Sequence, residues 1–402
     1  MDTYKDSIKL HKILKGKIEL TPRVDVKSMR DLSLIYTPGV AAPCSLIAEK
    51  PDKVYEFTAK ENTIAVISDG SRVLGLGNIG DLACIPVLEG KSVIFKLFAG
   101  INAIPLALKV KEPVEIINTV FAIAPNFSGI NLEDIEKPKC FLIESELQKR
   151  LEIPVFHDDQ HGTAIVTLAA LLNSLKIVGK KITGIKAVVI GAGAAGISVT
   201  KYLHTAGCRN IILCDSKGII HRGRSDLDPE KKEILEIVNK ESVEGNFEVA
   251  LKGADVVIGL STIPNLIKPE HIMVMSRDAV VFALTNPVPE IMPDKAKKAG
   301  AKIVATGRSD LPNQVNNSLV FPGIFRGALD TRAKTINMEM KMAAVKALAS
   351  IIPDSELSED NILPSMLNKK VVVRLASETA KAAIKSGVAR IKKKPDYKVA
   401  SD

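Results

Sequence analysis

Two carboxylates follow directly after a short apolar run and could bind a divalent cation. Asp158 and Asp159 lie within His157–His161, after the run Ile153–Phe156. Carboxylates at the carboxyl end of a strand are well placed to face a ligand, and oxygen ligands favour Mg²⁺ or Mn²⁺. The two histidines have the spacing of the zinc motif H-E-x-x-H, but its glutamate is missing. We therefore predict a magnesium or manganese site rather than a zinc site.

A second acidic pair, Glu133 and Asp134, follows Gly129–Leu132. Successive residues of a strand point to opposite faces of a sheet, so both carboxylates can serve one site only at a strand end or a turn. A solvated surface pair is the alternative interpretation.

Four further side chains could move protons or bind carboxylates. Lys91 precedes the apolar run Val93–Phe95, and desolvation together with neighbouring cations can lower the pKa of a lysine enough for it to act as a base. Arg72 could bind a carboxylate through two hydrogen bonds. Tyr36 lies in a proline-glycine turn and could act as an acid, and Asn286 follows an apolar run at an expected strand end. For an isolated lysine or arginine, a surface position is the alternative.

One glycine motif has the surroundings of a dinucleotide site. It reads Gly191-Ala192-Gly193-Ala194-Ala195-Gly196. It follows the expected strand Ala187–Ile190, and the next strand ends at Asp215, 19 residues after Gly196. Such glycines allow a tight turn, a close approach of backbone to pyrophosphate, and helix packing, while the acid binds ribose hydroxyls. A glycine-rich turn with no ligand is the alternative.

The residues after this acid give a mixed prediction of cofactor preference. Asp215 favours NAD because a carboxylate there repels a 2′-phosphate. Lys217, Arg222 and Arg224 follow closely and could bind that phosphate. We expect use of both nucleotides, with a preference for NAD.

A second G-x-G-x-x-G motif, Gly75–Gly80, does not predict a nucleotide site. Pro86 is expected to interrupt the helix that should follow, and no acidic residue stands between Glu89 and Glu112. We interpret this copy as a turn in a substrate domain.

The first part of the chain mixes short elements with dense turn signals. Val114–Ala124 and Phe141–Leu151 predict helices, and Ile64–Ile67, Val93–Leu97 and Val155–Phe156 predict strands. Catalytic groups commonly lie in loops of this kind.

After residue 160 the pattern changes to apolar runs separated by helical patterns or loops. A long helix is predicted over Gly162–Val178, and further helices over Met338–Ile352 and Val371–Ser386. The expected strands are Ala187–Ile190, Ile211–Cys214, Val256–Leu260, Val280–Leu284 and Ile303–Ala305. Strands alternating with helices predict an α/β fold with a doubly wound parallel sheet of the Rossmann type. We expect a substrate and catalytic domain over residues 1–160 and a dinucleotide-binding domain with C-terminal helices over residues 161–402.

Composition excludes several classes of protein. The 402 residues are 46% hydrophobic and 25% charged, as in globular proteins, and no apolar stretch approaches the length of a membrane span. Five cysteines without a C-x-x-C pair argue against disulfides and cysteine-bound zinc. The net charge of +9 is concentrated toward a basic tail from Lys381 to Lys398, and tryptophan is absent, so we expect no nucleic-acid partner. Without a signal-peptide pattern, a cytoplasmic location is expected.

Taken together, these segments resemble the malic enzymes, specifically the short prokaryotic type. The matching blocks occur in order along the chain and are Tyr36–Ala41, Ser68–Gly80, Glu89–Lys91, Asn131–Asp134, Val155–Ala164, Gly191–Gly196, Thr285–Pro287 and Ala305–Asp330.

The resemblance implies oxidative decarboxylation of L-malate to pyruvate and CO₂, with NAD or NADP and with Mg²⁺ or Mn²⁺. By the family pattern, Tyr36 is the general acid, Lys91 is the general base, and Asp158 supports the lysine. The implied metal ligands are Glu133, Asp134 and Asp159, and the implied malate contacts are Arg72, Asn286 and Asn317, with Asn316 adjacent. The expected cofactor-binding residues are Gly191, Gly193, Ala194, Ala195, Gly196, Asp215, Lys217 and Asn286.

Two other functions remain open at this stage. An amino-acid dehydrogenase also joins a substrate domain to a dinucleotide domain and uses a lysine, but it needs no metal. A non-catalytic dinucleotide-sensing module would not need Lys91 or Tyr36. A homodimer is expected, partly from the resemblance and partly because the amphipathic segment Ile8–Ile18 needs a partner surface.

Overall fold

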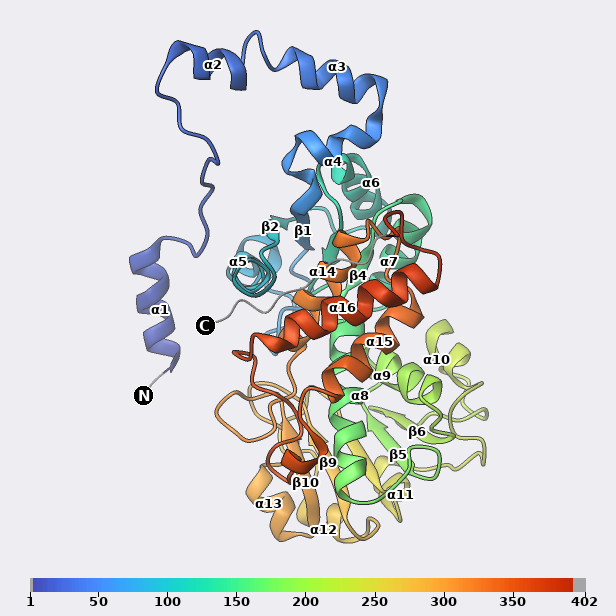
Figure 1. Cartoon of the computed structure of the whole chain (residues 1–402). Coiled ribbons are helices and arrows are strands. Elements are labelled where there is room, and N and C mark those ends of the chain that lie inside the picture. The colour runs from blue at the N-terminus through green and yellow to red at the C-terminus, as the bar shows by residue number, and fades with distance from the viewer. Residues whose placement is uncertain (1–2, 393–402) are drawn as a thin grey trace.

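Two sheets form the frame of the molecule, and helices pack around both of them (Figure 1). The structure, a computed structural model, describes residues 3–392. The predicted basic tail therefore lies partly outside the described residues.

The first sheet has four parallel strands in the order β2-β1-β3-β4. Its strands are β1 (Thr63–Ser68), β2 (Asn102–Ala107), β3 (Ile130–Leu132) and β4 (Val155–His157). Within the sheet, Ile67 pairs with Leu132, which in turn pairs with His157. Because the strands are parallel, the loops after β1, β3 and β4 meet at one edge of the sheet.

The second sheet has six strands in the order β10-β9-β8-β5-β6-β7. The strands are β5 (Lys186–Ile190), β6 (Asn210–Asp215), β7 (Gly218–Ile219), β8 (Val256–Gly259), β9 (Ala279–Ala283) and β10 (Ala301–Thr306). All pairs are parallel except β6 with β7. The five predicted strands and the α/β class are confirmed, while the short antiparallel edge strand β7 was not predicted.

Helices cover both faces of each sheet. On the first sheet, α6 (Pro113–Ile123) and α7 (Lys139–Arg150) cover one face, and α5 (Gly80–Ala99) packs on the other. On the second sheet, the outer face carries α11 (Phe247–Leu251), α12 (Pro269–Met273) and α13 (Pro293–Lys298). The remaining helices are α4 (Val54–Phe57), α8 (Asp158–Ile177), α9 (Ala194–Thr205), α10 (Pro229–Ile234), α14 (Phe321–Asp330), α15 (Met338–Ala349) and α16 (Lys370–Lys385).

Helix α5 corrects two predictions. Val93–Leu97 is not a strand, and Pro86 does not interrupt the helix, which runs without a break from Gly80 to Ala99. Leu88, Ser92 and Phe95 are buried at helical spacing along α5, and this packing outweighs the strand propensity of the local apolar run. The second glycine motif therefore does connect a strand to a helix.

The central helices join the two sheets into one body. Helix α8 leaves β4 and continues into the second part of the chain without a break at residue 160. Helix α14 packs against α5 of the first part, and α15 packs against α8. One large cluster of buried residues spans both sheets, including Phe95, Phe156 and Phe282.

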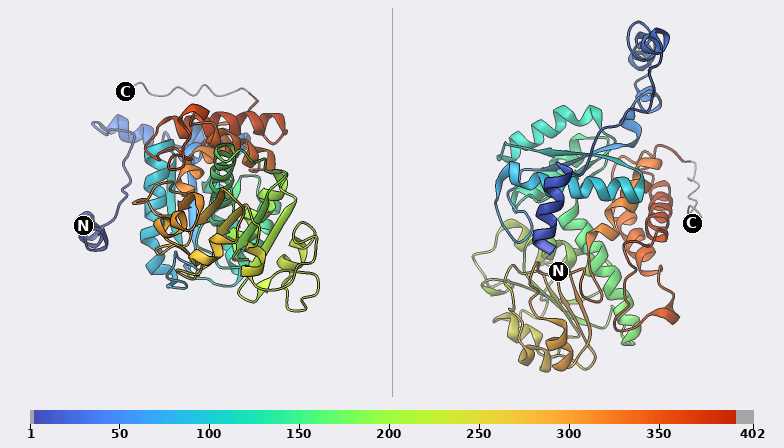
Figure 2. Two further views of the ribbon diagram at one scale, coloured as in Figure 1. Left: turned by 90° about the horizontal axis from the view of Figure 1, so that it is seen from below. Right: turned by 90° about the vertical axis from the view of Figure 1, so that its left-hand side faces the viewer.

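The amino-terminal arm, residues 3–50, lies apart from this body (Figures 1 and 2). It contains α1 (Thr3–Leu14), α2 (Met29–Ile35) and α3 (Ala41–Glu49), and none of these helices has a buried residue. At Lys17 it touches α5, where the backbone N–H donates to Glu89 at 3.1 Å and Nζ donates to the carbonyl of Pro86 at 2.7 Å. Over residues 3–392, no helix combines the length and apolar character needed to cross a membrane.

Candidate active site

A cavity of about 320 Å³ lies where the two parts of the chain meet. It is lined from the first part by the loops after β1 and β3 and by α5, and from the second part by α9 and the loops after β9 and β10. The predicted site residues that line it are Arg72, Lys91, Glu133, Asp134, Asp159, Gly193, Ala194, Ala195, Asn286, Asn316 and Asn317. The structure thus brings together residues that are more than 200 positions apart in the sequence.

Glu133, Asp134 and Asp159 form a carboxylate triplet at the edge of the first sheet. Each offers an oxygen that lies within 4.8 Å of the others. Asp134 lies in a turn directly after β3, with φ of +52°. Because the pair stands at a strand end, both of its carboxylates can face the same site. The backbone N–H of Asp134 donates to Asp159 Oδ2 at 2.8 Å, whereas Asp134 Oδ2 is buried and has no hydrogen-bond partner within residues 3–392.

The triplet is electrostatically costly without a cation. Burial, together with the nearby charge of Asp159, raises the pKa of Asp134 to about 8. Burial also raises the pKa of Glu133. Buried carboxylates with an unused oxygen and only oxygen donors fit Mg²⁺ or Mn²⁺.

Lys91 lies beside the triplet on α5, with only 10% of its side chain exposed. Its Nζ is 3.0 Å from Glu133 Oε2, forms a short hydrogen bond with Asp158 Oδ2, and lies 4.3 Å from the centre of the Phe321 ring. Burial alone lowers the pKa of Lys91, but the carboxylates of Asp158 and Glu133 outweigh burial and raise it. This direction is opposite to the lowered pKa expected from the sequence, because the charged groups around Lys91 are carboxylates and not the cations on which that expectation depended.

Asp158 lies behind the cavity wall in the first turn of α8 and is fully buried. Its Oδ1 has no hydrogen-bond partner among the described residues, and a Cβ at Gly162 would stand 1.9 Å from that atom. Gly162 therefore leaves the space in which Asp158 reaches Lys91. Burial raises the pKa of Asp158 to about 6, although Lys91 opposes this.

The asparagines and Arg72 lie around the same cavity. Asn286 follows β9, and a Cβ at Gly75 would approach its carbonyl oxygen to 2.7 Å. The second glycine motif thus packs against the nucleotide-binding part of the chain. The side chain of Asn316 accepts from the backbone N–H of Ser318 at 2.9 Å, so it also shapes the turn that carries Asn317.

In the glycine motif between β5 and α9, two of the three glycines stand where a side chain would meet the backbone, and the third borders open space. Gly191 has φ of +112°, and a Cβ at Gly196 would stand 1.8 Å from the carbonyl oxygen of Gly191. A Cβ at Gly193 would meet no atom within 4 Å, so this glycine borders open space. The first turn of α9 lines the cavity, where its N-terminus favours an anion. The motif fits a dinucleotide pyrophosphate.

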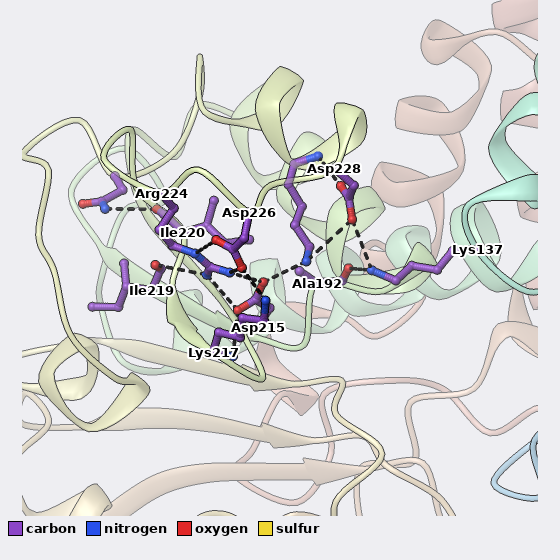
Figure 3. Close-up of polar contacts among 11 residues, drawn as sticks. Lys137, Ala192, Asp215, Lys217, Ile219, Ile220, Arg224, Asp226 and Asp228 are labelled. Atoms are coloured by element: carbon purple, nitrogen blue, oxygen red, sulfur yellow. Dashed lines mark hydrogen bonds and ion pairs between the residues drawn. The ribbon is translucent and has the colours of Figure 1, made fainter.

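Three predicted site residues lie away from this cavity. Asp215 and Lys217 lie at the end of β6, among the charged residues of Figure 3. Tyr36 lies in the amino-terminal arm with 68% of its surface exposed, and it lines no part of the cavity. Within one chain, the structure does not bring Tyr36 to Lys91.

Sequence reasoning missed the residues that support the site from behind. Glu144 on α7 accepts from the backbone N–H of His157 at 2.9 Å and from Gln160 Nε2 at 3.2 Å, and it contacts His161 at 3.0 Å. Lys341 Nζ lies 3.1 Å from His161 Nε2. The sequence feature that could have indicated this support is Glu144 itself, a glutamate inside an apolar helical pattern.

Comparison with known proteins identifies the family. Residues 15–114 match the family description "Malic enzyme, N-terminal domain", and residues 160–384 match "Malic enzyme, NAD binding domain". The chain belongs to the malic enzyme family. This assignment replaces the amino-acid dehydrogenase and the sensing module as interpretations.

Similar malic enzymes cover almost the whole chain. A bifunctional malic/malolactic enzyme of Bacillus subtilis is 51% identical over 98% of this chain and 97% of its own length. An NAD-dependent malic enzyme of Geobacillus stearothermophilus is 54% identical over 93% of this chain and 78% of its own. The crystal structure of the Pyrococcus horikoshii malic enzyme has a TM-score of 0.90 and 52% identity, and the match covers 96% of this chain and 93% of that one. Further relatives are named NADP-dependent malic enzymes.

Proposed function

We propose that this chain catalyses the oxidative decarboxylation of L-malate to pyruvate and CO₂, with NAD or NADP and with Mg²⁺ or Mn²⁺. One observation carries the proposal. A single cavity is lined by Lys91, by the carboxylate triplet and by the first turn of α9. Family membership supports the same reaction.

A nucleotide held at the glycine motif would supply the hydride acceptor for C2 of malate, and a cation held at the carboxylate triplet would supply a Lewis acid for the C2 oxygen. Glu133, Asp134 and Asp159 hold the cation. Lys91 takes the proton of the C2 hydroxyl and must therefore be neutral when it does so. Positive charge at the triplet offsets the acidic neighbours that raise the pKa of Lys91, and Asp158 keeps the amine in place.

Malate carries two carboxylates, and the chain offers suitable donors around the cavity. We assign Arg72, Asn286 and Asn317 to these carboxylates. Arg72 lies in the loop after β1, and its backbone N–H donates to the carbonyl of Asp134 at 3.0 Å. This bond ties the arginine to the carboxylate triplet, so substrate and metal sites are positioned together.

We further propose a homodimer in which Tyr36 of one subunit enters the active site of the other. The arm buries none of its helical residues in its own chain, and it exposes apolar side chains along its length. They include Ile8, Ile13, Leu20, Met29 and Leu34. A second copy of this chain would cover this surface. In the proposed reaction the loss of CO₂ leaves an enolate, and Tyr36 from the second copy would protonate its carbon to give pyruvate.

Two smaller assignments complete the proposal. We place the protein in the cytoplasm, because all five cysteines are free and four of them are buried, as suits a reducing compartment. We keep the division of the chain near residue 160, although α8 and α14 tie the two parts together.

The deciding experiment is a malate assay with each nucleotide, in Mn²⁺ and in EDTA. We expect one CO₂ and one pyruvate per reduced nucleotide, and no turnover in EDTA. Reduced nucleotide without CO₂ would contradict decarboxylation. Full turnover in EDTA would contradict the role of the carboxylate triplet.

A further inference from the structure

Asp215, the acid at the ribose end of the dinucleotide motif, has no free acceptor position (Figure 3). Its Oδ1 accepts from Arg224 Nη1 at 2.8 Å and from the backbone N–H of Lys217 at 2.9 Å. Its Oδ2 accepts from Arg224 Nη2 at 3.0 Å and from Lys231 Nζ at 2.8 Å. A carboxylate has about four lone-pair sites, so these bonds use all of them.

These bonds also balance the charge that would repel a 2′-phosphate. Burial raises the pKa of Asp215, but the hydrogen bonds from Arg224 and Lys231 outweigh it and lower the pKa to about 2. The acid is therefore a charged member of a network rather than an isolated negative group. The network contains the cations Lys137, Lys217, Arg224 and Lys231 and the acids Asp215, Asp226 and Asp228. Each of these three acids is paired with at least one of the cations, so none of them is an isolated negative charge at the ribose end.

Asp226 is more exposed than Asp215, and it is held by the same arginine. Lys217 Nζ is 2.8 Å from its Oδ2, and Arg224 binds it with two nitrogens, Nε at 2.9 Å and Nη2 at 2.8 Å. Its side chain is 33% exposed, whereas those of Arg224 and Asp215 are 10% and 8% exposed. The charged or titratable residues that line a surface hollow of about 530 Å³ here are Lys217, His221, Arg224, Asp226 and Glu244. The arginine fork and the lysine thus converge on a carboxylate that solvent can reach.

We propose that Lys217 and Arg224 form a subsite for the 2′-phosphate of NADP, and that the Asp226 carboxylate fills this subsite until the phosphate displaces it. Arginine forks bind carboxylate and phosphate oxygens with the same two-pronged geometry. The exchange leaves Asp215 bound to Lys231 and to the backbone of Lys217. This inference rests on the proposed function in one respect, since it places the ribose of the nucleotide at the end of β6.

Arg222 offers a matched control. It belongs to the same loop and carries the same charge, but it pairs with Glu236 at 3.1 Å, and its side chain is 65% exposed. It takes no part in the network around Asp215. The sequence grouped Arg222 with Lys217 and Arg224 as a candidate phosphate ligand, and the structure separates them.

The test measures nucleotide binding without malate or metal. Adenosine 2′,5′-bisphosphate and 5′-AMP are titrated into the full chain by calorimetry. We expect the bisphosphate to bind at least about tenfold more tightly than AMP, and Lys217→Met to remove about tenfold of that preference. Asp226→Asn removes the competing carboxylate and should tighten bisphosphate binding several-fold. Arg222→Met should leave both affinities unchanged.

Other results would overturn the inference. Equal affinity for the two nucleotides in the wild-type chain would show that no 2′-phosphate subsite exists. Weaker bisphosphate binding in Asp226→Asn would show that Asp226 supports the site rather than occupying it. The outcome is separate from the proposed reaction. If the chain oxidises malate with NAD but shows no preference for the bisphosphate, the proposed subsite is wrong and the proposed reaction stands. If it prefers the bisphosphate but does not turn over malate, the proposed reaction is wrong and the subsite stands.

Discussion

Lys91 shows how strongly the immediate neighbours decide the chemistry of a residue. Its side chain is buried between Glu133, Asp158 and the ring of Phe321. Burial favours the neutral amine, and the two carboxylates favour the charged one. The balance lies toward the charged form as long as Glu133 is not paired with another cation. The site is therefore arranged so that occupancy of the carboxylate triplet and the protonation of Lys91 are linked.

Replacing Lys91 by methionine should abolish turnover without unfolding the protein. Methionine keeps the length of the side chain but cannot accept a proton, and loss of a general base costs about 10²–10⁴-fold in rate. Steady-state kinetics and circular dichroism would measure the two effects. Lys96→Met on the same helix is the control, because Lys96 is exposed and its Nζ donates to Asn102 Oδ1 at 2.8 Å, away from the carboxylate triplet. A loss of less than tenfold in Lys91→Met would contradict the role of base.

Removal of the divalent cation should lower the thermal stability of the protein as well as its activity. A cation that binds only the folded chain adds about 2.7 kcal/mol at one hundred times its dissociation constant. We expect Mn²⁺ to raise the melting temperature of the wild-type chain, and Asp159→Asn to lose that increase. Asp354→Asn, an exposed acid paired with Lys176, should keep it. An equal increase in both variants would mean that Mn²⁺ binds elsewhere.

At the level of helices and strands, the sequence predicted most of the second sheet. Its strands are runs of apolar residues buried on both faces, such as Val256–Gly259 and Ala279–Ala283, so the pattern is strong. The first sheet was harder to predict from the sequence. Strand β3 has three residues, β2 contains Pro105, and the strand-like run in α5 takes its conformation from packing against α14. Tertiary contacts decided these elements, and a local pattern does not contain them.

Glu144 should stabilise the junction of β4 and α8 in a pH-dependent way. Burial raises the pKa of Glu144, but His161 and Lys341 outweigh it and lower the pKa from 4.5 to about 2. A carboxyl group with a lowered pKa in the folded state adds stability above its unfolded pKa. That stability is lost as the pH falls from about 4.5 toward 2.

Glu144→Gln tests this role. We expect the variant to lose about 1–3 kcal/mol of unfolding free energy at neutral pH, because an amide cannot satisfy the same donors. Below about pH 4.5, the unfolding free energy of the variant should also fall less steeply than that of the wild type. Urea denaturation over a pH series would measure both. Glu146→Gln on the same helix is the control. Glu146 pairs with Lys149 at 2.8 Å where solvent reaches both side chains, so this variant should lose much less unfolding free energy than Glu144→Gln.

At the scale of the whole molecule, the candidate site could be predicted as a set of residues but not as an arrangement. The glycine motif and the acidic groups carry local signals, so Gly193, Asp159 and Glu133 were identified and do line one cavity. No local signal shows that Lys91 would be enclosed by carboxylates or that Asp215 would be held by Lys231. In the proposed homodimer, the position of Tyr36 relative to the cavity would depend on a second chain, which a single sequence does not contain.

If the arm is exchanged between subunits as proposed, two variants that are inactive alone should recover malate turnover when they form a mixed dimer. Tyr36→Phe lacks the acid and Lys91→Met lacks the base, so each homodimer should have little malate turnover. In a mixed dimer, one site combines the intact Lys91 of one chain with the intact Tyr36 of the other. The second site combines both defects. Random mixing makes about half of the dimers mixed, with one working site in each, so about a quarter of the wild-type activity should return.

The variants must be unfolded and refolded together, or expressed together, so that subunits can exchange. Each variant treated in the same way without the other is the control, and light scattering reports the oligomeric state. If Tyr36 instead folded back onto its own subunit, every site in every dimer would carry one defect or the other, and mixing would restore nothing. Recovery therefore depends on the arm reaching the partner subunit, and its absence in a confirmed mixed dimer would show that the two residues act within one chain.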